Sequence, residues 1–217
     1  MNTMFKKILI IFTFIQFFCQ LSIAESIKVF NFTEEGLKEL KVKKVKGITS
    51  WSLGSNDKGP YIRAEAKGKA SGLGKELKIN LLKTPFINIT WKIEKNLSGI
   101  VENSKKGHDY AARVFVIKKT GATALSNRAI NYVFSSNNSI NENWPSPYTK
   151  KSIDYVLSTT KKNNNEWVTV KANVREHFKK LFNLDVNELS GVAIMTDTDN
   201  SKLKAIAYYQ NIHFSSK

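Results

Sequence analysis

The residues best suited to chemistry in this chain are one arginine and three aspartates placed among apolar segments. Arg113 stands between Ala111 and Phe115 on the face of an alternating segment that is otherwise apolar. A buried arginine requires a carboxylate partner, because an unpaired charge is very costly away from water. The alternative is that Arg113 lies at a strand end or on an outer face and forms a surface pair. The candidate partners are Asp109, Asp197 and Asp199.

The segment Thr196–Asn200 follows an apolar strand and contains two carboxylates and an amide. Oxygen-rich groups of this kind suit calcium. The match to an EF-hand loop fails, because Lys202 stands in place of the turn glycine and Tyr208 in place of the bidentate glutamate. Aspartate and asparagine are also ordinary turn formers. We therefore expect no metal or other cofactor, with calcium as the alternative, and favour an ion pair with Arg113 or hydrogen bonds to a ligand.

Aromatic side chains could form a binding surface. Trp144 and Tyr148 lie in a proline-containing loop, and flat aromatic faces on such loops stack well on sugar rings. We expect Trp144 and Tyr132 to stack on a ligand or line its site. The alternative is that Trp144 and Tyr148 fill a hydrophobic hole under the loop. Trp91 alternates with isoleucines, which indicates a core residue.

The sequence gives little evidence of a catalytic site. The three histidines, at 108, 177 and 213, lack metal-ligand spacing. His108 next to Asp109 could act as a base, and Asp109 with Asp197 could form a glycosidase pair. The sequence contains neither a Gly-x-Ser-x-Gly elbow nor a phosphate-binding glycine loop.

The N-terminus has the pattern of a secretory signal peptide. A lysine pair precedes the apolar run 8–18, and small residues end at Ala24. We expect cleavage after Ala24 and a single mature domain over residues 25–217; the alternative is an uncleaved N-terminal anchor. Cleavage removes the only cysteine, so the mature chain has no disulfide.

The formal net charge of the chain is +16. Such a charge could attract anionic glycans, lipid head groups or nucleic acid. However, 30 of the 34 basic residues are lysine, which is weaker than arginine in bidentate phosphate recognition. We interpret the lysines as a solvated surface of a basic protein and expect no nucleic-acid partner.

Short alternating segments bounded by polar turns predict a mostly β chain. One helix is expected over Asn173–Leu184, with Asn173 as its N-cap. Because helices do not alternate with the strands, a parallel α/β sheet is not expected, and a β-sandwich of the jelly-roll type fits best. Loops are expected over 95–106 and 136–151. The expected strands are Ile27–Phe32, Trp51–Leu53, Tyr61–Ala66, Ala70–Ile79, Phe86–Ile93, Asp109–Ile117, Arg128–Ser135, Ile153–Leu157, Trp167–Ala172, Val192–Thr196 and Ala205–Phe214.

Six segments between Tyr61 and Asn200 carry a family resemblance. They are Tyr61–Ala66, Ala70–Leu73, Asp109–Val114, Asn131–Val133, Trp144–Tyr148 and Met195–Asn200. Together they resemble an exported bacterial family, the domain-of-unknown-function family three-zero-four-seven. The chain departs from that pattern at Ile89, where the family has a second tryptophan. The resemblance implies a periplasmic or secreted protein with a sandwich similar to galactose-binding-like and carbohydrate-binding modules, and it brings no established activity.

These observations favour a monomeric, non-catalytic sandwich that binds a saccharide or a cell-envelope glycan. The first alternative is a glycan hydrolase or lyase that uses Asp109 and Asp197, or His108, and it requires carboxylates that face each other across an open groove. The second is a structural envelope protein that acts through a partner, with an exposed apolar patch and no concave pocket. The candidate ligand-binding residues are Asp109, Arg113, Tyr132, Trp144, Tyr148, Asp197, Asp199 and Asn200.

Overall fold

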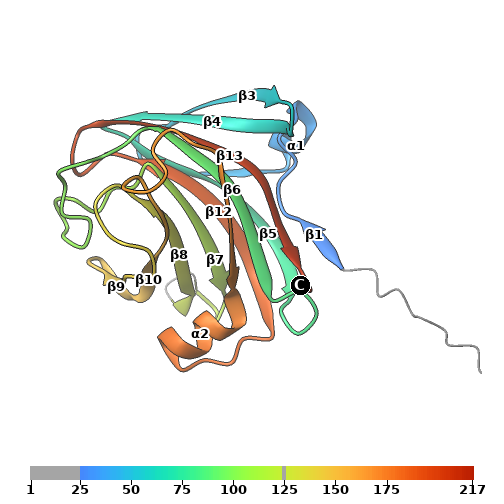
Figure 1. Ribbon diagram of the computed structural model, residues 1–217. Helices are drawn as coiled ribbons and strands as arrows, with labels where there is room; N and C mark the ends of the chain where they lie inside the picture. The colour runs from blue at the N-terminus through green and yellow to red at the C-terminus, as the bar shows by residue number, and fades with distance from the viewer. Residues whose placement is uncertain (1–24, 124–125) are drawn as a thin grey trace, which may run out of the picture.

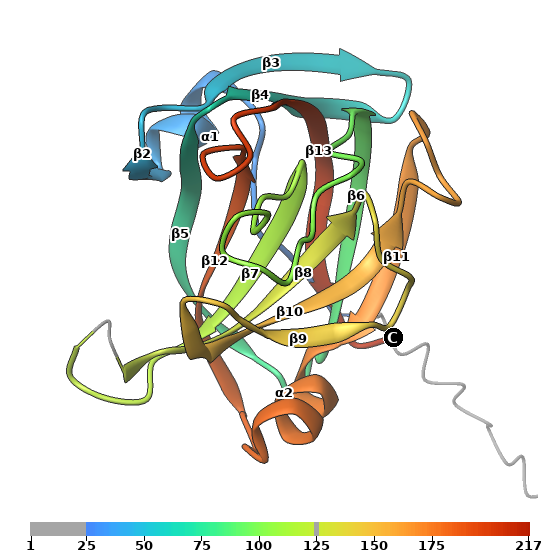
Figure 2. The same cartoon turned by 90° about the vertical axis from the view of Figure 1, so that its left-hand side faces the viewer.

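A computed structural model describes residues 25–123 and 126–217. The expected signal peptide lies outside these residues. The chain folds into two packed β-sheets with two short helices at the ends of the sandwich (Figures 1 and 2). In the described part of the chain, no helix is long and apolar enough to cross a membrane.

One sheet has six strands, ordered β11-β6-β13-β4-β3, with β1 pairing on β13. The alternation expected for β6 is confirmed, because Ile87, Ile89, Trp91 and Ile93 are all fully buried on one face. The strands of this sheet are β1 (Ser26–Lys28), β3 (Ser50–Asn56), β4 (Gly59–Lys67), β6 (Phe86–Lys95), β11 (Val168–Asn173) and β13 (Lys204–Ser215).

The second sheet has seven strands, ordered β2-β5-β12-β7-β8-β10-β9. Figure 2 shows β5, β12, β7, β8 and β10 side by side in this sheet. The pairs are antiparallel except for β8 with β10, which are parallel. Its strands are β2 (Lys41–Lys46), β5 (Ala70–Asn80), β7 (Ala112–Lys118), β8 (Arg128–Ser135), β9 (Asn143–Ser146), β10 (Thr149–Thr159) and β12 (Glu188–Asp197).

The expected helix is confirmed as α2 (Val174–Phe182), and the Asn173 side chain caps it by accepting from the Glu176 backbone N–H. Asn183 ends the helix in the left-handed conformation with φ of 52°, which asparagine tolerates better than most residues. A second helix, α1 (Glu34–Lys38), is capped by Thr33. The described part of the chain is thus mostly β, as expected.

Two strands were not expected from the sequence. Lys41–Lys46 forms the edge strand β2, whose residues are all exposed. Asn143–Ser146 lies within an expected loop but forms β9, where Pro145 is tolerated because β9 is an edge strand. In addition, the strand expected over Ala70–Ile79 is continuous and extends to Asn80.

Candidate functional site

Arg113 forms a buried ion pair with Asp197. The two strands that carry them are antiparallel neighbours, with Arg113 opposite Met195, so Asp197 lies two residues farther along the same face. The Arg113 guanidinium donates to Asp197 Oδ2 and lies 5.1 Å from the Tyr110 ring centroid and 5.4 Å from that of Phe115. Arg113 is 5% exposed and Asp197 1%. The expected carboxylate partner is therefore confirmed. The pair lies on the outer face of the sheet, but it is buried and is not the surface pair of the alternative.

Burial and the neighbouring charges shift the pKa values of both residues of this pair. Burial raises the pKa of Asp197 to about 7, Arg113 opposes the rise, and Asp109 and Asp199 add to it. Burial tends to lower the pKa of Arg113, but Asp197 and Asp154 outweigh this effect and leave the pKa raised. Arg113 therefore remains charged although it is buried.

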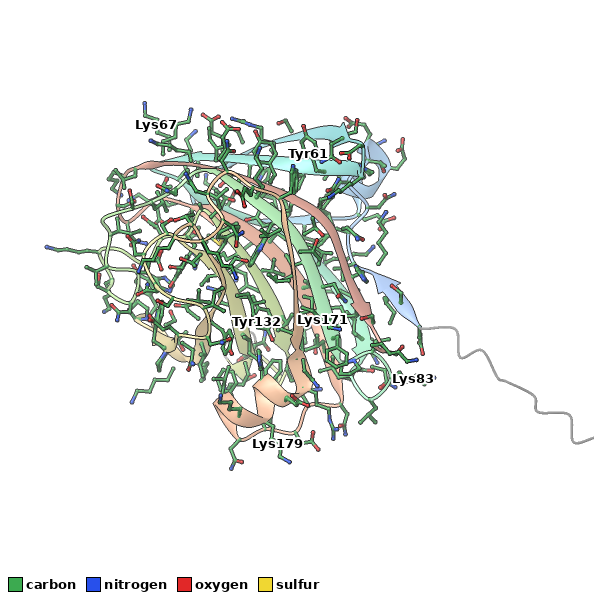
Figure 3. All side chains as sticks on the ribbon, viewed as in Figure 1. Tyr61, Lys67, Lys83, Tyr132, Lys171 and Lys179 are labelled. Atoms are coloured by element: carbon green, nitrogen blue, oxygen red, sulfur yellow. The ribbon has the colours of Figure 1, made fainter. Side chains whose placement is uncertain are left out.

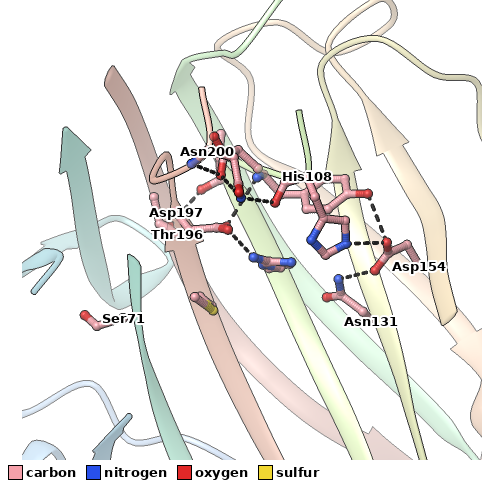
Figure 4. Close-up of polar contacts among 12 residues, drawn as sticks. Ser71, His108, Asn131, Asp154, Thr196, Asp197 and Asn200 are labelled. Atoms are coloured by element: carbon pink, nitrogen blue, oxygen red, sulfur yellow. Dashed lines mark hydrogen bonds and ion pairs between the residues drawn. The ribbon is translucent and has the colours of Figure 1, made fainter. Parts of the chain in front are cut away.

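Asp109 holds the turn that follows β12. Its Oδ1 accepts from the Asn200 backbone N–H at 3.1 Å and from Asn200 Nδ2 at 3.0 Å, and its Oδ2 accepts from the Ser201 backbone N–H at 2.5 Å. Asp109 is fully buried. Asp109 and Asp197 are both buried and already bonded, so they do not form the carboxylate pair across an open groove that the hydrolase or lyase alternative requires. Figure 4 shows Asp197 within the polar network.

A second buried network surrounds Asp154, which sequence reasoning missed. His108 Nε2 lies 2.7 Å from Asp154 Oδ2, Asn131 Nδ2 donates to Oδ1 at 2.6 Å, and the Tyr110 hydroxyl donates to Oδ2 at 3.2 Å. Asp154 is fully buried. An aspartate between the apolar residues of an expected strand is the signal that could have identified it, because the same reasoning identified Arg113.

Asp109, Asp197 and Asp199 each place one carboxylate oxygen within 4.8 Å of the others. This is the oxygen cluster that calcium would use. However, Asp197 is paired with Arg113, and Asp109 accepts three hydrogen bonds. The local positive charge and these donors already satisfy the two buried carboxylates.

Trp144 and Tyr148 lie around one group of rings, because Trp144 packs against Tyr110 and the His108 ring centroid lies 5.4 Å from those of both Tyr110 and Tyr148. Trp144 is half-buried and packs against Tyr110, Val133 and Val156, whereas Tyr148 is exposed and donates to Asn200 Oδ1 at 2.6 Å. Tyr148 therefore lies at the Asp109 turn.

The prediction that Tyr132 contacts a ligand is wrong. Its ring is fully buried in the core, and its hydroxyl lies 3.0 Å from His177 Nδ1. Tyr132 lies close to helix α2 (Figure 3). Strand alternation places it on the opposite face of β8 from its neighbours Asn131 and Val133.

A groove of about 630 Å³ lies on the outer face of the seven-stranded sheet, over β2, β5, β12 and β7. In the sheet register, Gly74 is opposite Ala193, and Ala193 is opposite Phe115. Glycine and alanine leave the backbone of β5 and β12 uncovered, so the groove floor is flat at its centre. The floor and walls include Gly72, Gly74, Phe115, Ile117, Ala193 and Met195.

The groove and the ion-pair network meet at Phe115. Phe115 lines the groove, and its ring contacts the Arg113 guanidinium. Met195, opposite Arg113 in the register, also lines the groove. The predicted residues Arg113 and Asp197 therefore lie beside the groove and hold one of its walls. The groove itself was not predicted from the sequence.

A second aromatic group lies on the outer face of the six-stranded sheet. Tyr61, Trp167 and Tyr208 contact one another with ring-centroid distances of 5.5 to 5.9 Å. Lys92 Nζ lies 5.1 Å from the Tyr208 ring centroid. The three rings are tilted against each other by 52° to 74°, so they form a cluster rather than one flat platform.

Comparison with solved structures identifies the same kind of sandwich in carbohydrate-binding modules. The family 30 module of the cellulosomal cellulase Cel9D-Cel44B of Clostridium thermocellum superposes with a TM-score of 0.50 and 8% identity, over 89% of this chain and 98% of that chain. An engineered cellulase derived from Cel12A of Rhodothermus marinus gives a TM-score of 0.49 and 8% identity, over 88% and 96%. At 8% identity the likeness to the family 30 module shows the fold alone, and it confirms the expected jelly-roll-type sandwich.

Sequence comparison gives the family. No curated protein sequence matches the chain. A family model, described as protein of unknown function (DUF3047), matches residues 35–213. This match covers most of the chain and contains all six segments on which the resemblance was based. The chain therefore belongs to the DUF3047 family of proteins of unknown function.

Proposed function

We propose that this chain is an exported, non-catalytic module that binds a saccharide in the groove of the seven-stranded sheet. The observation that carries the proposal is the groove itself, with a volume of about 630 Å³ and an apolar floor. Ligand pockets have volumes of roughly 300–1,000 Å³ and combine apolar walls with a few polar groups. Phe115 gives the ligand an aromatic surface on which a sugar ring can pack.

The buried polar network has a positioning role in this proposal. Arg113 and Asp197 fix the outer face of β7 and β12 next to Phe115. Asp109 and Asn200 hold the turn after β12. The likeness of the sandwich to a carbohydrate-binding module supports the choice of a saccharide. The signal-peptide pattern supports export.

The two alternatives fit the groove less well. The hydrolase or lyase would require an open carboxylate pair, and the two aspartates expected for it are buried and already bonded. The partner-dependent envelope protein would present an exposed apolar patch without a concave pocket, whereas this sheet carries a groove.

Blocking the groove tests the proposal. A Cβ at Gly74 would lie 3.5 Å from the Ala193 Cβ and 3.9 Å from the Lys41 carbonyl oxygen, which is ordinary contact, so Gly74→Phe fills the groove without backbone strain. Val101→Phe is the matched control, because Val101 is 63% exposed and lies outside the groove. Residues 25–217 of each form are applied to a glycan array.

The proposal expects at least one saccharide that the unchanged domain and Val101→Phe bind and Gly74→Phe does not. Thermal unfolding checks that Gly74→Phe is folded, and Ala193→Leu provides a second, smaller block. Equal binding by the blocked and unblocked forms, or no saccharide bound by the unchanged domain, contradicts the proposal.

A further inference from the structure

The charges around the groove are almost all of one sign. Four lysines and one glutamate line it, which leaves an excess of three positive charges. The charged residues are Lys41, Lys43, Lys75, Lys119 and Glu76. A concave surface with one sign of charge attracts ligands of the opposite sign.

Glu76 forms ion pairs with two of these lysines. Lys41 Nζ lies 3.1 Å from Glu76 Oε1, and Lys119 Nζ lies 3.4 Å from Oε2. Hydrogen bonds from Lys41 and Lys119 lower the pKa of Glu76, so it stays ionised. Glu76 thus connects an ammonium group on β2 with one just after β7, and both remain at the edge of the groove.

Lys43 is the lysine most available to a ligand. It is exposed and has no carboxylate partner among the residues that the structure describes, whereas Lys75 is paired with Glu39 at 2.6 Å. In the register Lys43 is opposite Gly72, which has no side chain to cover the ammonium group. A carboxylate lying over Gly72 could accept a charge-assisted hydrogen bond from Lys43.

We propose that the saccharide recognised by this groove carries carboxylate groups, as in chains of uronic acids. This inference rests on the proposed function, because it names the ligand class of the same groove. The apolar floor contacts the sugar rings, and the lysines at the edge contact their carboxylates. Lysine is abundant over the whole surface, so the test must separate the lysines of the groove from the net charge of the protein.

The probes are oligosaccharides of galacturonate, mannuronate and hyaluronan, each beside its carboxyl-reduced neutral form. Affinities are measured by calorimetry at physiological salt for the unchanged domain, Lys43→Gln, Lys83→Gln and Gly74→Phe. Lys83 is the matched control, because it is exposed in the turn after β5 and its replacement changes the net charge by the same amount (Figure 3). The proposal expects tighter binding of at least one acidic probe than of its neutral form.

The variants show whether the groove lysines or the net charge of the protein cause the preference for acidic probes. Lys43→Gln should weaken acidic-probe binding about 5- to 10-fold, Lys83→Gln should leave it unchanged, and Gly74→Phe should abolish it. Equal weakening by both lysine variants would overturn the inference, because the net charge would then be the cause. Neutral saccharides bound as well as acidic ones, with Gly74→Phe blocking both, would overturn the inference but leave the proposed function intact. Binding that Gly74→Phe does not block would overturn both.

Discussion

Gly74 of β5 lies directly opposite Ala193 of β12, and neither residue places a large side chain on the outer face of the sheet. A Cβ at Gly74 would be only 3.5 Å from that of Ala193. The two residues therefore keep the middle of the seven-stranded sheet open, while Phe115 on β7 and the lysines of β2 rise on either side. The groove is a consequence of small residues that meet through tertiary pairing.

Phe115→Ala should weaken saccharide binding about 5- to 30-fold, because the ring is the aromatic contact of the groove. Phe115 is only half-buried, so the change should cost little stability. Calorimetric titration with the best saccharide measures the affinity. Tyr61→Ala is the matched control from the aromatic cluster of the other sheet. If Tyr61→Ala weakened binding and Phe115→Ala did not, the ligand would bind to the six-stranded sheet, and the proposed groove would be contradicted.

Arg113→Ala should lower the free energy of unfolding by about 3–5 kcal/mol, because it leaves Asp197 buried and unpaired. The double variant Arg113→Met with Asp197→Asn removes both charges and should recover much of this loss. Arg63→Ala breaks a partly exposed pair with Glu65 and should cost less than about 1 kcal/mol. Urea unfolding measures all three variants. A cost for Arg113→Ala no greater than that for Arg63→Ala would contradict the buried pair.

Acid should destabilise the fold through His177. Burial, with a contribution from Lys180, lowers its pKa to about 4, whereas an unfolded histidine titrates near pH 6.5. Between these values the unfolded chain binds a proton at this residue that the folded chain does not, so the contribution of His177 to the free energy of unfolding falls as the pH decreases from about 6.5 to about 4. The contribution is on the order of 1–2 kcal/mol, since the ring is partly exposed.

His177→Gln should remove this pH-dependent part and retain an acceptor for the Tyr132 hydroxyl. Urea unfolding between pH 4 and pH 7 gives the difference between the two proteins. An unchanged pH slope in His177→Gln would show that the histidine titrates at a similar pH in the folded and unfolded chains, contrary to the lowered pKa.

Calcium should have little effect on stability. Arg113 and the hydrogen-bond donors to Asp109 already satisfy the two buried carboxylates of the aspartate cluster. Addition of Ca²⁺ or of a chelator should change the melting temperature by less than about 1 °C. A rise of several degrees with Ca²⁺, lost in Asp199→Asn, would show that the cluster holds a cation.

Much of the fold could be predicted from local pattern. The alternation of Ile87, Ile89, Trp91 and Ile93 predicts β6 and its buried face, and Asn173 predicts the start of α2. β2 was not predicted because both of its faces are exposed, so its sequence shows no alternation of apolar and polar residues. Its lysines disfavour pairing of the open edge with another chain. Its strand character comes from pairing with β5, which no local pattern contains.

The candidate site was predicted in part. An arginine among apolar residues requires a nearby carboxylate, which is why Asp197 could be named as one of three candidate partners of Arg113. Tyr132 was misplaced because its side of β8 was not compared with that of Asn131. The groove could not be predicted, since it depends on the register that brings Gly74 to Ala193.

The most direct test of the account is to locate a bound saccharide on the ¹⁵N-labelled domain by NMR titration. A saccharide site in the groove predicts that the amide signals with the largest shifts belong to Gly72, Gly74, Phe115 and Ala193. Shifts confined to Tyr148 and Asn200, or to Tyr61 and Tyr208 on the other sheet, would contradict it.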